Sequence, residues 1–171
     1  MKYSGAAYRA LHPRWSFAPL SGEGAAIHGG RFNPRGVPAL YLGTSVEVAF
    51  LEATQGFAFK FSPLTMCSFE IDCDDIVDLR DDPQREAVGV RAQDMSCAWF
   101  SAIADGKRPA SWAIYEQLKG NAAGILVPSY APGVSPAMSN LVLWDWAAAG
   151  RHAVTLHDPD RRLPRDGRSW E

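Results

Sequence analysis

Residues 28–36, HGGRFNPRG, place an arginine directly after a pair of glycines and shortly before an Asn-Pro turn. Gly29 and Gly30 allow the backbone to adopt positive φ angles and to approach a ligand closely. The Asn-Pro and Arg-Gly dipeptides are turn formers that restrict the rest of the loop. Arg31 is therefore expected on a stiff loop, where its planar guanidinium can bind phosphate or carboxylate oxygens. The alternative is a structural arginine that ties the loop to backbone carbonyls or to an acid.

The composition of the chain is that of a globular protein with one core. Its 171 residues are 47% hydrophobic and 21% charged, and this length fits a single domain. The formal net charge of −2 provides no overall basic field for nucleic acid. No apolar run approaches the roughly 20 residues that cross a membrane, and the N-terminal stretch lacks the apolar region of a secretory signal. We therefore expect a cytoplasmic protein that binds neither nucleic acid directly nor membranes.

Cysteine and histidine residues show no spacing typical of a metal site. The three cysteines include no C-x-x-C pair, so they are expected to be reduced and mostly buried thiols. The four histidines are scattered along the chain. We therefore expect no bound metal.

A strand followed by a helix is predicted just after the loop. Residues 39–42, ALYL, form a short apolar run that is typical of a buried strand. Thr44 can cap the next helix, Glu47 can complete a capping box, and Gly56 is expected to end the helix. The expected apolar face of this helix consists of Val46, Ala49, Phe50 and Ala53.

The rest of the chain has the pattern of an α+β protein without internal repeats. Further strands are expected at residues 8–15, 66–71, 76–79, 124–130, 141–146 and 153–157. Helices are expected at residues 91–104 and 111–119. We predict one compact domain, residues 1–158, with mixed short strands and flanking helices. Residues 159–171 are polar and are expected to form a solvated extension, with a segment that docks to a partner as the alternative.

Four further side chains can accompany Arg31 at a ligand site. Tyr41 either packs in the core with its hydroxyl hydrogen bonded or presents its ring to a pocket. Glu52 lies on the flank of the predicted helix and either faces solvent or points into a cleft. Ser129 ends an apolar strand without a G-x-S-x-G elbow, so it is expected to form hydrogen bonds rather than act as a nucleophile. Asn140, just before the next apolar run, has the same ambiguity.

The order of these segments resembles the RES domain, the toxin half of bacterial toxin–antitoxin pairs, which is named for its arginine, glutamate and serine. The GGRFNP loop is the specific part, and the resemblance extends over roughly residues 3–158. By position, the family's functional residues fall on Arg31, Tyr41, Glu52 and Ser129. The segment PAMSNLVLW departs from the strand pattern of many relatives, so Ser139 competes with Ser129 for the role of the serine.

The resemblance implies a fold like that of bacterial ADP-ribosyltransferase toxins and the use of NAD as a co-substrate. The forked cation of Arg31 suits the pyrophosphate, and Tyr41 can form an aromatic wall for nicotinamide. Glu52 would stabilise the positive charge that develops on the ribose when the nicotinamide–ribose bond breaks. The predicted catalytic residues are Glu52, Arg31 and Tyr41. The predicted NAD-binding residues are Arg31, Tyr41, Ser129, Gly30 and Asn33.

Among the activities associated with the family, the chain looks most similar to the ParT-like branch, which is linked to modification of phosphoribosyl pyrophosphate synthetase. Transfer of ADP-ribose to a protein acceptor of nucleotide metabolism is therefore the expected activity. Hydrolysis or phosphorolysis of NAD is the alternative, and a nucleotide-binding module without catalysis ranks third. The resemblance also implies a cognate antitoxin that occludes the active site. The aromatic residues that could contact it, or else pack in the core, are Trp144, Trp146 and Trp170.

Overall fold

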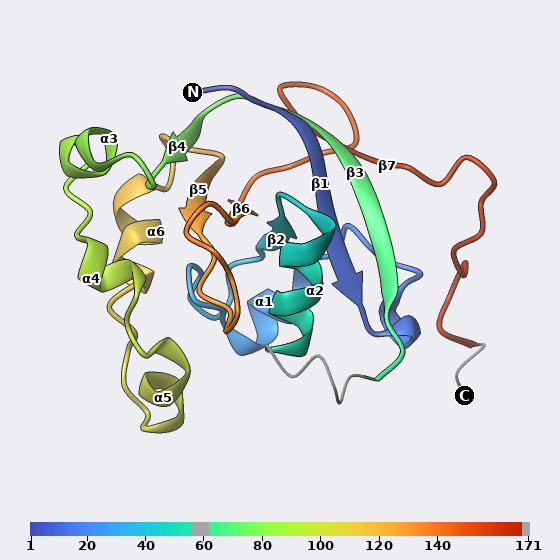
Figure 1. The fold of residues 1–171 in the computed structure, drawn as a ribbon, viewed down its shortest axis with the longest axis horizontal. Coiled ribbons are helices and arrows are strands. Elements are labelled where there is room, and N and C mark those ends of the chain that lie inside the picture. The colour runs from blue at the N-terminus through green and yellow to red at the C-terminus, as the bar shows by residue number, and fades with distance from the viewer. Residues whose placement is uncertain (56–61, 169–171) are drawn as a thin grey trace.

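A seven-stranded sheet forms the centre of the computed structural model, which describes residues 1–55 and 62–168 (Figure 1). The order across the sheet is β4-β5-β6-β2-β1-β3-β7, and every neighbouring pair is antiparallel except β4 with β5. The strands are β1 Tyr3–Leu11, β2 Leu40–Gly43, β3 Thr65–Cys73, β4 Ile76–Asp78, β5 Gly124–Pro128, β6 Ser139–Leu143 and β7 His152–Leu156. The α+β class is therefore confirmed.

Short helices flank this sheet. They are η1 Pro13–Trp15, α1 Glu23–His28, α2 Val46–Thr54, α3 Asp82–Ala87, α4 Ala92–Met95, α5 Trp99–Ala104 and α6 Trp112–Leu118. The single helix expected at residues 91–104 is wrong, because α4 and α5 are separated at the point where Arg31 binds the carbonyl oxygens of Met95 and Cys97. The sequence analysis did not predict α1 or α3.

Strand β1 begins five residues earlier than its apolar pattern indicates. It pairs with β3 along its whole length, from Tyr3 opposite Cys73 to Leu11 opposite Thr65. The small and polar residues at its start are exposed, so they carry no hydrophobic signal. The chain leaves the strand before Pro13, which fixes φ and starts a 3-10 turn instead of extending the strand to residue 15.

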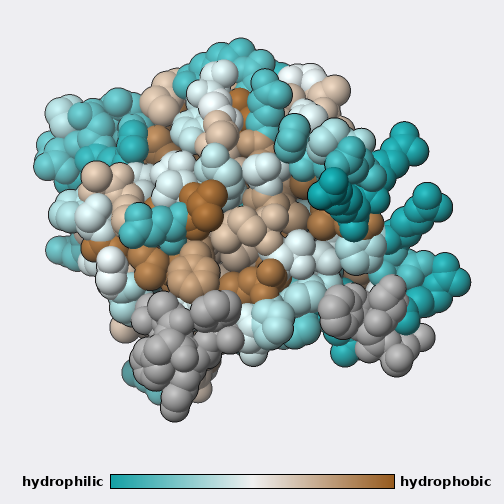
Figure 2. Space-filling view, turned by 45° about the vertical axis from the view of Figure 1, so that its right-hand side comes forward, coloured by the Kyte–Doolittle hydropathy of each residue, from teal (hydrophilic) through white to brown (hydrophobic). Residues whose placement is uncertain are grey.

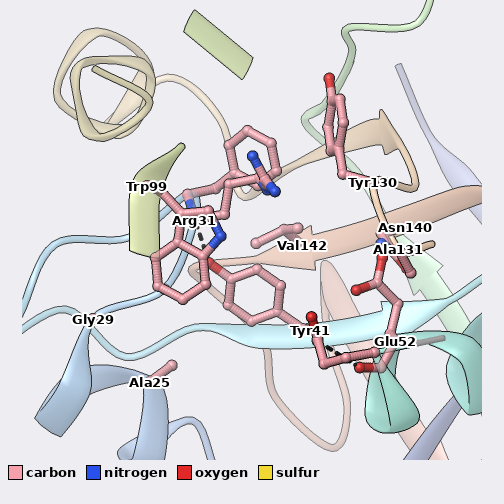
Figure 3. Close-up of a pocket in the computed structure, with 13 residues that line it drawn as sticks. Ala25, Gly29, Arg31, Tyr41, Glu52, Trp99, Tyr130, Ala131, Asn140 and Val142 are labelled. Atoms are coloured by element: carbon pink, nitrogen blue, oxygen red, sulfur yellow. Dashed lines mark hydrogen bonds between the residues drawn. The ribbon is translucent and has the colours of Figure 1, made fainter. Parts of the chain in front are cut away.

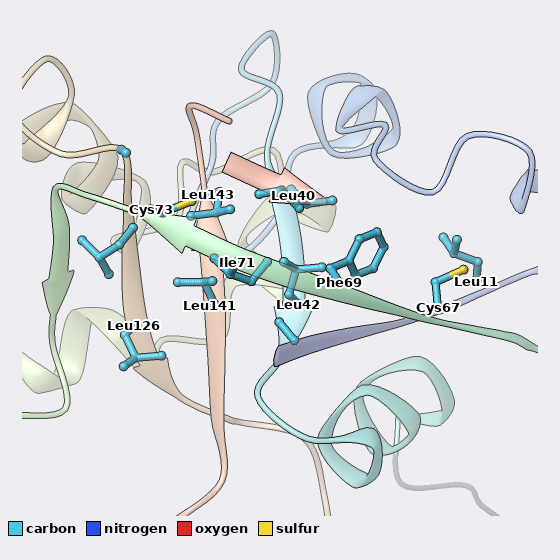
Figure 4. Close-up of a cluster of buried hydrophobic side chains, with 14 residues drawn as sticks. Leu11, Leu40, Leu42, Cys67, Phe69, Ile71, Cys73, Leu126, Leu141 and Leu143 are labelled. Atoms are coloured by element: carbon cyan, nitrogen blue, oxygen red, sulfur yellow. The ribbon is translucent and has the colours of Figure 1, made fainter. Parts of the chain in front are cut away.

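Both faces of the central strands are buried. Side chains alternate between the two faces of a sheet, so the buried residues of these strands divide into two cores. One core contains Leu40, Leu42, Phe69, Ile71, Leu126, Leu141 and Leu143 (Figure 4). The other core contains Phe32, Leu79, Ile114, Leu118, Ile125, Val127 and Val142. The first core is covered by loops and the C-terminal segment, and the second is covered by α6 and the loop that carries Phe32.

Helix α2 starts one residue later than predicted. The Ser45 hydroxyl accepts a hydrogen bond of 3.2 Å from the backbone nitrogen of Val48, so Ser45 is the N-cap. The Thr44 hydroxyl instead donates to the carbonyl of Ser139 at 3.0 Å. The capping box of Thr44 and Glu47 is therefore wrong, because the actual cap pairs with residue 48. The expected helix end at Gly56 lies outside the described residues.

The buried face of α2 also differs from the prediction. Val48, Ala49 and Thr54 are buried, whereas Val46 and Ala53 are exposed. A Cβ at Gly43 would lie only 2.6 Å from the backbone nitrogen of residue 49, so a glycine there lets the helix pack directly on β2. This rotation turns the Glu52 side of the helix toward the middle of the sheet, where a cavity opens.

The C-terminal segment after β7 returns to the domain. Leu163 packs against the first core, and the Asp158 carboxylate accepts hydrogen bonds from the backbone of Arg162 at 2.8 Å and of Leu163 at 3.2 Å. Apolar residues gather toward the middle of the face in Figure 2, and hydrophilic side chains project at its margins. Within the described ranges, no helix combines the length and apolarity that crossing a membrane requires.

Candidate active site

A cavity of about 280 Å³ opens over the middle of the sheet, and residues of α1, α2 and α5 border it (Figure 3). Tyr41 and Val142 are directly opposite in the β2–β6 pair, so both point to the same face and line the floor. Arg31 and Glu52 line the walls. The structure thus brings together the three residues that the sequence analysis predicted to be catalytic.

Two hydrogen bonds to one oxygen fix the carboxylate of Glu52. The Ser129 hydroxyl donates to Oε1 at 2.6 Å, and the Asn140 side-chain amide donates to the same oxygen. Oε2 has no hydrogen-bond partner among residues 1–55 and 62–168. Glu52 is partly buried and lines the cavity, so its second oxygen is available for a bound molecule.

The geometry separates the two serines that compete in the sequence. Ser129 contacts Glu52, whereas the Ser139 hydroxyl accepts a 3.2 Å hydrogen bond from Arg80, which a bidentate pair with Asp78 holds in place. Ser129 is only 7% exposed and is not part of the cavity lining. Its position suits orienting the carboxylate, and a direct contact between Ser129 and NAD stays a prediction.

Arg31 makes the structural contacts that the sequence left open as one alternative, and among the described residues part of its guanidinium stays free for the other. Its Nη1 donates to the carbonyls of Met95 at 3.1 Å and Cys97 at 2.9 Å, and its guanidinium carbon lies 4.6 Å from the centre of the Tyr130 ring. Burial lowers the pKa of Arg31, and neighbouring acidic groups, including the carboxylate of Glu52, oppose that shift. Within the described part of the chain, Nε and Nη2 have no hydrogen-bond partner and can still bind an anion.

Tyr41 and Asn33 hold the glycine-rich loop against the sheet. The Tyr41 hydroxyl donates to Oδ1 of Asn33 at 2.7 Å and accepts from the backbone nitrogen of Phe32 at 2.9 Å. The Asn33 amide donates to the carbonyls of Ala25 at 2.8 Å and Val37 at 2.9 Å. Asn33 is 0% exposed and does not line the cavity, so in this structure its side chain holds the loop, and its contact with NAD stays a prediction. Burial raises the pKa of Tyr41 far above its usual range, so its hydroxyl stays neutral.

The two glycines of the loop serve different purposes. Gly29 has a φ of +74°, whereas Gly30 does not have positive φ, contrary to the expectation for both. A Cβ at Gly30 would lie 2.5 Å from the Tyr41 hydroxyl and 2.5 Å from Asn33 Oδ1, so close packing excludes any larger residue. The Gly30 carbonyl accepts a 2.7 Å hydrogen bond from the Trp112 indole. Gly30 still lines the cavity, beside the Arg31 side chain.

Several residues that line the cavity were not among the predicted site residues, and three of them have side chains suited to binding a ligand: Asn140, Trp99 and Tyr130. Asn140 was left ambiguous, although an amide in the otherwise apolar SNLVL strand was a usable signal. Trp99 and Tyr130 line the cavity from α5 and from the chain after β5, and only the tertiary fold brings them there. Among the described residues, no group of histidine, cysteine and acidic side chains could hold a metal.

The aromatic residues expected at a partner surface are partly core residues. The Trp144 indole donates to the carbonyl of Phe32 at 3.0 Å, and the Trp146 indole donates to that of Leu20 at 3.1 Å. Both pack against the cores, and Trp170 lies outside the described residues. Trp144 and Trp146 are thus structural residues with satisfied indole groups.

Two comparisons with known proteins find similar chains. The chain is 33% identical over 120 residues to proteins named NAD(+) phosphorylase MbcT from Mycobacterium tuberculosis and Mycobacterium bovis, and the match covers 64% of this chain. The chain spans 60% of the length of these curated relatives. The crystal structure of the M. tuberculosis MbcT-MbcA toxin-antitoxin complex has a similar fold, with a TM-score of 0.57 and 24% identity, over 90% of this chain and 82% of that one.

A third comparison covers nearly the whole chain. The family model of the RES domain matches residues 6–166, which include the glycine-rich loop, the Glu52 helix and both strands of the cavity floor. The match also runs past the domain end expected at residue 158, into the segment where Leu163 packs on the core. This chain belongs to the RES domain family.

Proposed function

We propose that this protein is a toxin that consumes NAD by breaking its nicotinamide–ribose bond, with orthophosphate as the acceptor. The observation that carries the proposal is the carboxylate of Glu52, which Ser129 and Asn140 orient through one oxygen while the other remains available across the cavity from Arg31. The name of the MbcT relatives, NAD(+) phosphorylase, supports the choice of acceptor.

The chemistry places positive charge close to this carboxylate. When the bond between nicotinamide and ribose breaks, the electron pair leaves with nicotinamide, and C1 of the ribose becomes oxocarbenium-like. A preorganised carboxylate at Glu52 stabilises that charge more than it stabilises the bound substrate, so it lowers the barrier. An orthophosphate oxygen then forms the new bond to C1 and gives ADP-ribose 1-phosphate without net oxidation.

Arg31 provides the binding side of the proposal. Its unpaired Nε and Nη2 form a planar edge that suits the pyrophosphate of NAD. The two carbonyls on Nη1 and the Tyr130 ring fix the orientation of that edge before substrate arrives. Preorganisation of this kind reduces the entropy that binding would otherwise cost.

Product analysis distinguishes the possible acceptors. Purified protein would be incubated with NAD, with and without orthophosphate, and the products separated by mass. We expect nicotinamide release that depends on orthophosphate and yields ADP-ribose 1-phosphate. Release that is independent of phosphate and yields ADP-ribose would instead identify a hydrolase. Binding without release would identify a nucleotide-binding module.

Transfer to a protein, the activity expected first from the sequence, is tested in the same assay. Adding cell lysate and labelled NAD would reveal label in a protein band if an acceptor such as phosphoribosyl pyrophosphate synthetase were modified. Neither the curated relatives nor the structural neighbour named above supports that acceptor. We therefore rank protein transfer below phosphorolysis.

We also propose that a cognate antitoxin covers the cavity in the cytoplasm, where the toxin would meet NAD. The similar fold of a protein solved as a toxin-antitoxin complex supports this partner. Expression of the chain alone should arrest growth, and co-expression with the antitoxin should relieve the arrest. Glu52→Gln should abolish the toxicity. Arrest that persists in this variant would show that NAD consumption is not its cause.

A further inference from the structure

Trp99 forms an aromatic wall of the cavity that the proposed chemistry does not yet use. It is the first residue of α5, and its partly buried indole lines the cavity. In Figure 3, Trp99 and Glu52 lie on opposite sides of the pocket, with the Tyr41 ring between them. A molecule that contacts Glu52 and fills the pocket therefore reaches the indole.

The chain on both sides of α5, the helix that begins at Trp99, is hydrogen bonded to Arg31. The two carbonyls bound by Arg31, those of Met95 and Cys97, directly precede α5. The Ser111 hydroxyl, which follows α5 in the chain, donates to the carbonyl of Arg31. Hydrogen bonds on both sides of α5 thus set the position of Trp99 relative to the glycine-rich loop.

The neighbouring aromatic residue on α5 is different. Phe100 is 72% exposed and does not line the cavity. Its ring meets the edge of the Trp99 ring at a centroid distance of 5.7 Å and an interplanar angle of 83°. Two adjacent aromatic residues on one helix therefore differ in contact with the cavity, which Trp99 lines and Phe100 does not.

We propose that Trp99 is a substrate-binding residue that stacks on the nicotinamide ring of NAD. This proposal rests on the proposed function, because Glu52 must lie next to the scissile bond. A cavity of about 280 Å³ is at the small end of ligand pockets, so it accommodates only part of NAD. Because Glu52 lies in this cavity, that part is the ribose at the scissile bond with its attached nicotinamide. The oxidised nicotinamide ring is cationic, and tryptophan is the side chain that binds cations best through its ring face.

Stacking of this kind has a specific kinetic signature. The ring contact is made in the bound substrate as well as in the transition state, so its loss raises KM and changes kcat little. Loss of Glu52 has the opposite signature, because the charge on the ribose develops only in the transition state. The two residues therefore act on different kinetic parameters although they line one cavity.

The test compares Trp99→Leu and Trp99→Phe with Phe100→Leu as the matched control on the same helix. Affinities would be measured for nicotinamide mononucleotide, which lacks adenine, and for ADP-ribose, which lacks nicotinamide. We expect Trp99→Leu to weaken mononucleotide binding by about ten- to a hundred-fold and to raise KM for NAD, with ADP-ribose affinity unchanged. Trp99→Phe should restore part of the loss, and Phe100→Leu should behave like the wild type.

Three results would overturn the proposal. Equal affinities for Trp99→Leu and Phe100→Leu would show that the indole binds no ring, and weakened ADP-ribose binding alone would assign the indole to adenine. A lower melting temperature of Trp99→Leu with equal losses for both ligands would indicate a structural role.

Failure of the proposed function is distinguishable from these results. Wild-type protein that binds mononucleotide without ever releasing nicotinamide from NAD would refute the enzyme, while the affinity comparison would still decide the role of Trp99. Wild-type protein that binds neither ligand would overturn both proposals.

Discussion

Replacing Tyr41 with phenylalanine removes one oxygen atom and tests how the glycine-rich loop is held. That hydroxyl donates to Oδ1 of Asn33 at 2.7 Å and accepts from the backbone nitrogen of Phe32 at 2.9 Å. Asn33 is fully buried, so water cannot replace the lost partner without a rearrangement of the loop. Tyr41→Phe leaves both groups without their partner and keeps the aromatic ring that lines the cavity.

The expected cost follows from these two groups. A buried donor or acceptor that loses its partner costs about 1–3 kcal/mol, so two such groups cost about 2–4 kcal/mol with partial relaxation. In a domain of this size, each kcal/mol lowers the melting temperature by about 2–4 °C, so the expected decrease is about 4–15 °C. Thermal unfolding followed by circular dichroism would measure this decrease.

A matched control separates the hydroxyl from the substitution itself. Tyr115 is partly buried and packs edge-on against Trp144, and its hydroxyl has no hydrogen bond among the described residues. Tyr115→Phe should therefore leave the melting temperature within about 2 °C of the wild type. If Tyr41→Phe were as stable as this control, the hydroxyl would not hold the loop, and the account of Asn33 would be refuted.

Three further predictions concern charged residues. Arg31→Lys should lower both the melting temperature and NAD affinity, because lysine can replace neither the contacts to two carbonyls nor the planar edge. A change in affinity alone would mean that the carbonyl contacts contribute no stability. Glu52→Gln should reduce kcat by orders of magnitude in the nicotinamide-release assay with NAD affinity retained, while Glu47→Gln, exposed and without a capping role, should match the wild type. Hydrogen bonds from Arg80 hold the pKa of Asp78 below its usual range. The pair therefore stabilises the fold fully above about pH 4, and this stabilisation is lost as the pH falls through the lower pKa of the folded state. Asp78→Asn should remove this contribution to the acid dependence of the unfolding free energy, measured between about pH 2 and pH 5.

The glycine-rich loop could be predicted from sequence because its constraints are local. The two glycines before the arginine permit conformations that other residues avoid, and the Asn-Pro pair after it restricts the backbone, whatever surrounds them. The hydrogen-bond partner of each polar side-chain atom could not be predicted. The amide of Asn33 and Nη1 of Arg31 donate to carbonyls of α1, the loop and the α4–α5 segment, and these meet only after the chain folds.

The helix that carries Glu52 shows the limit of periodicity. Assigning the cap to Thr44 instead of Ser45 moves the helix start by one residue but does not change which residues share a face. The apolar face was assigned from the spacing of Val46, Ala49, Phe50 and Ala53 alone, and Glu52 was left on its flank, whereas the structure buries Val48, Ala49 and Thr54. Contact between Gly43 and Ala49 fixes the actual rotation, and no periodicity within the helix reveals that contact.

Some polar atoms of Arg31, Tyr41 and Glu52 are hydrogen bonded within the protein, and others are free at the cavity within the described part of the chain. One oxygen of Glu52 and one nitrogen of Arg31 are bound within the protein, and the hydroxyl of Tyr41 is used entirely for the loop. Loss of activity in a variant of these residues is therefore expected even where the lost group never touches NAD. Stability must be measured beside kcat and KM for each variant, because only a residue whose free atom faces the cavity can change kinetics without changing the melting temperature. By this criterion, we expect variants of Glu52 to change the proposed chemistry and variants of Tyr41 to change the stability of the loop that carries Arg31.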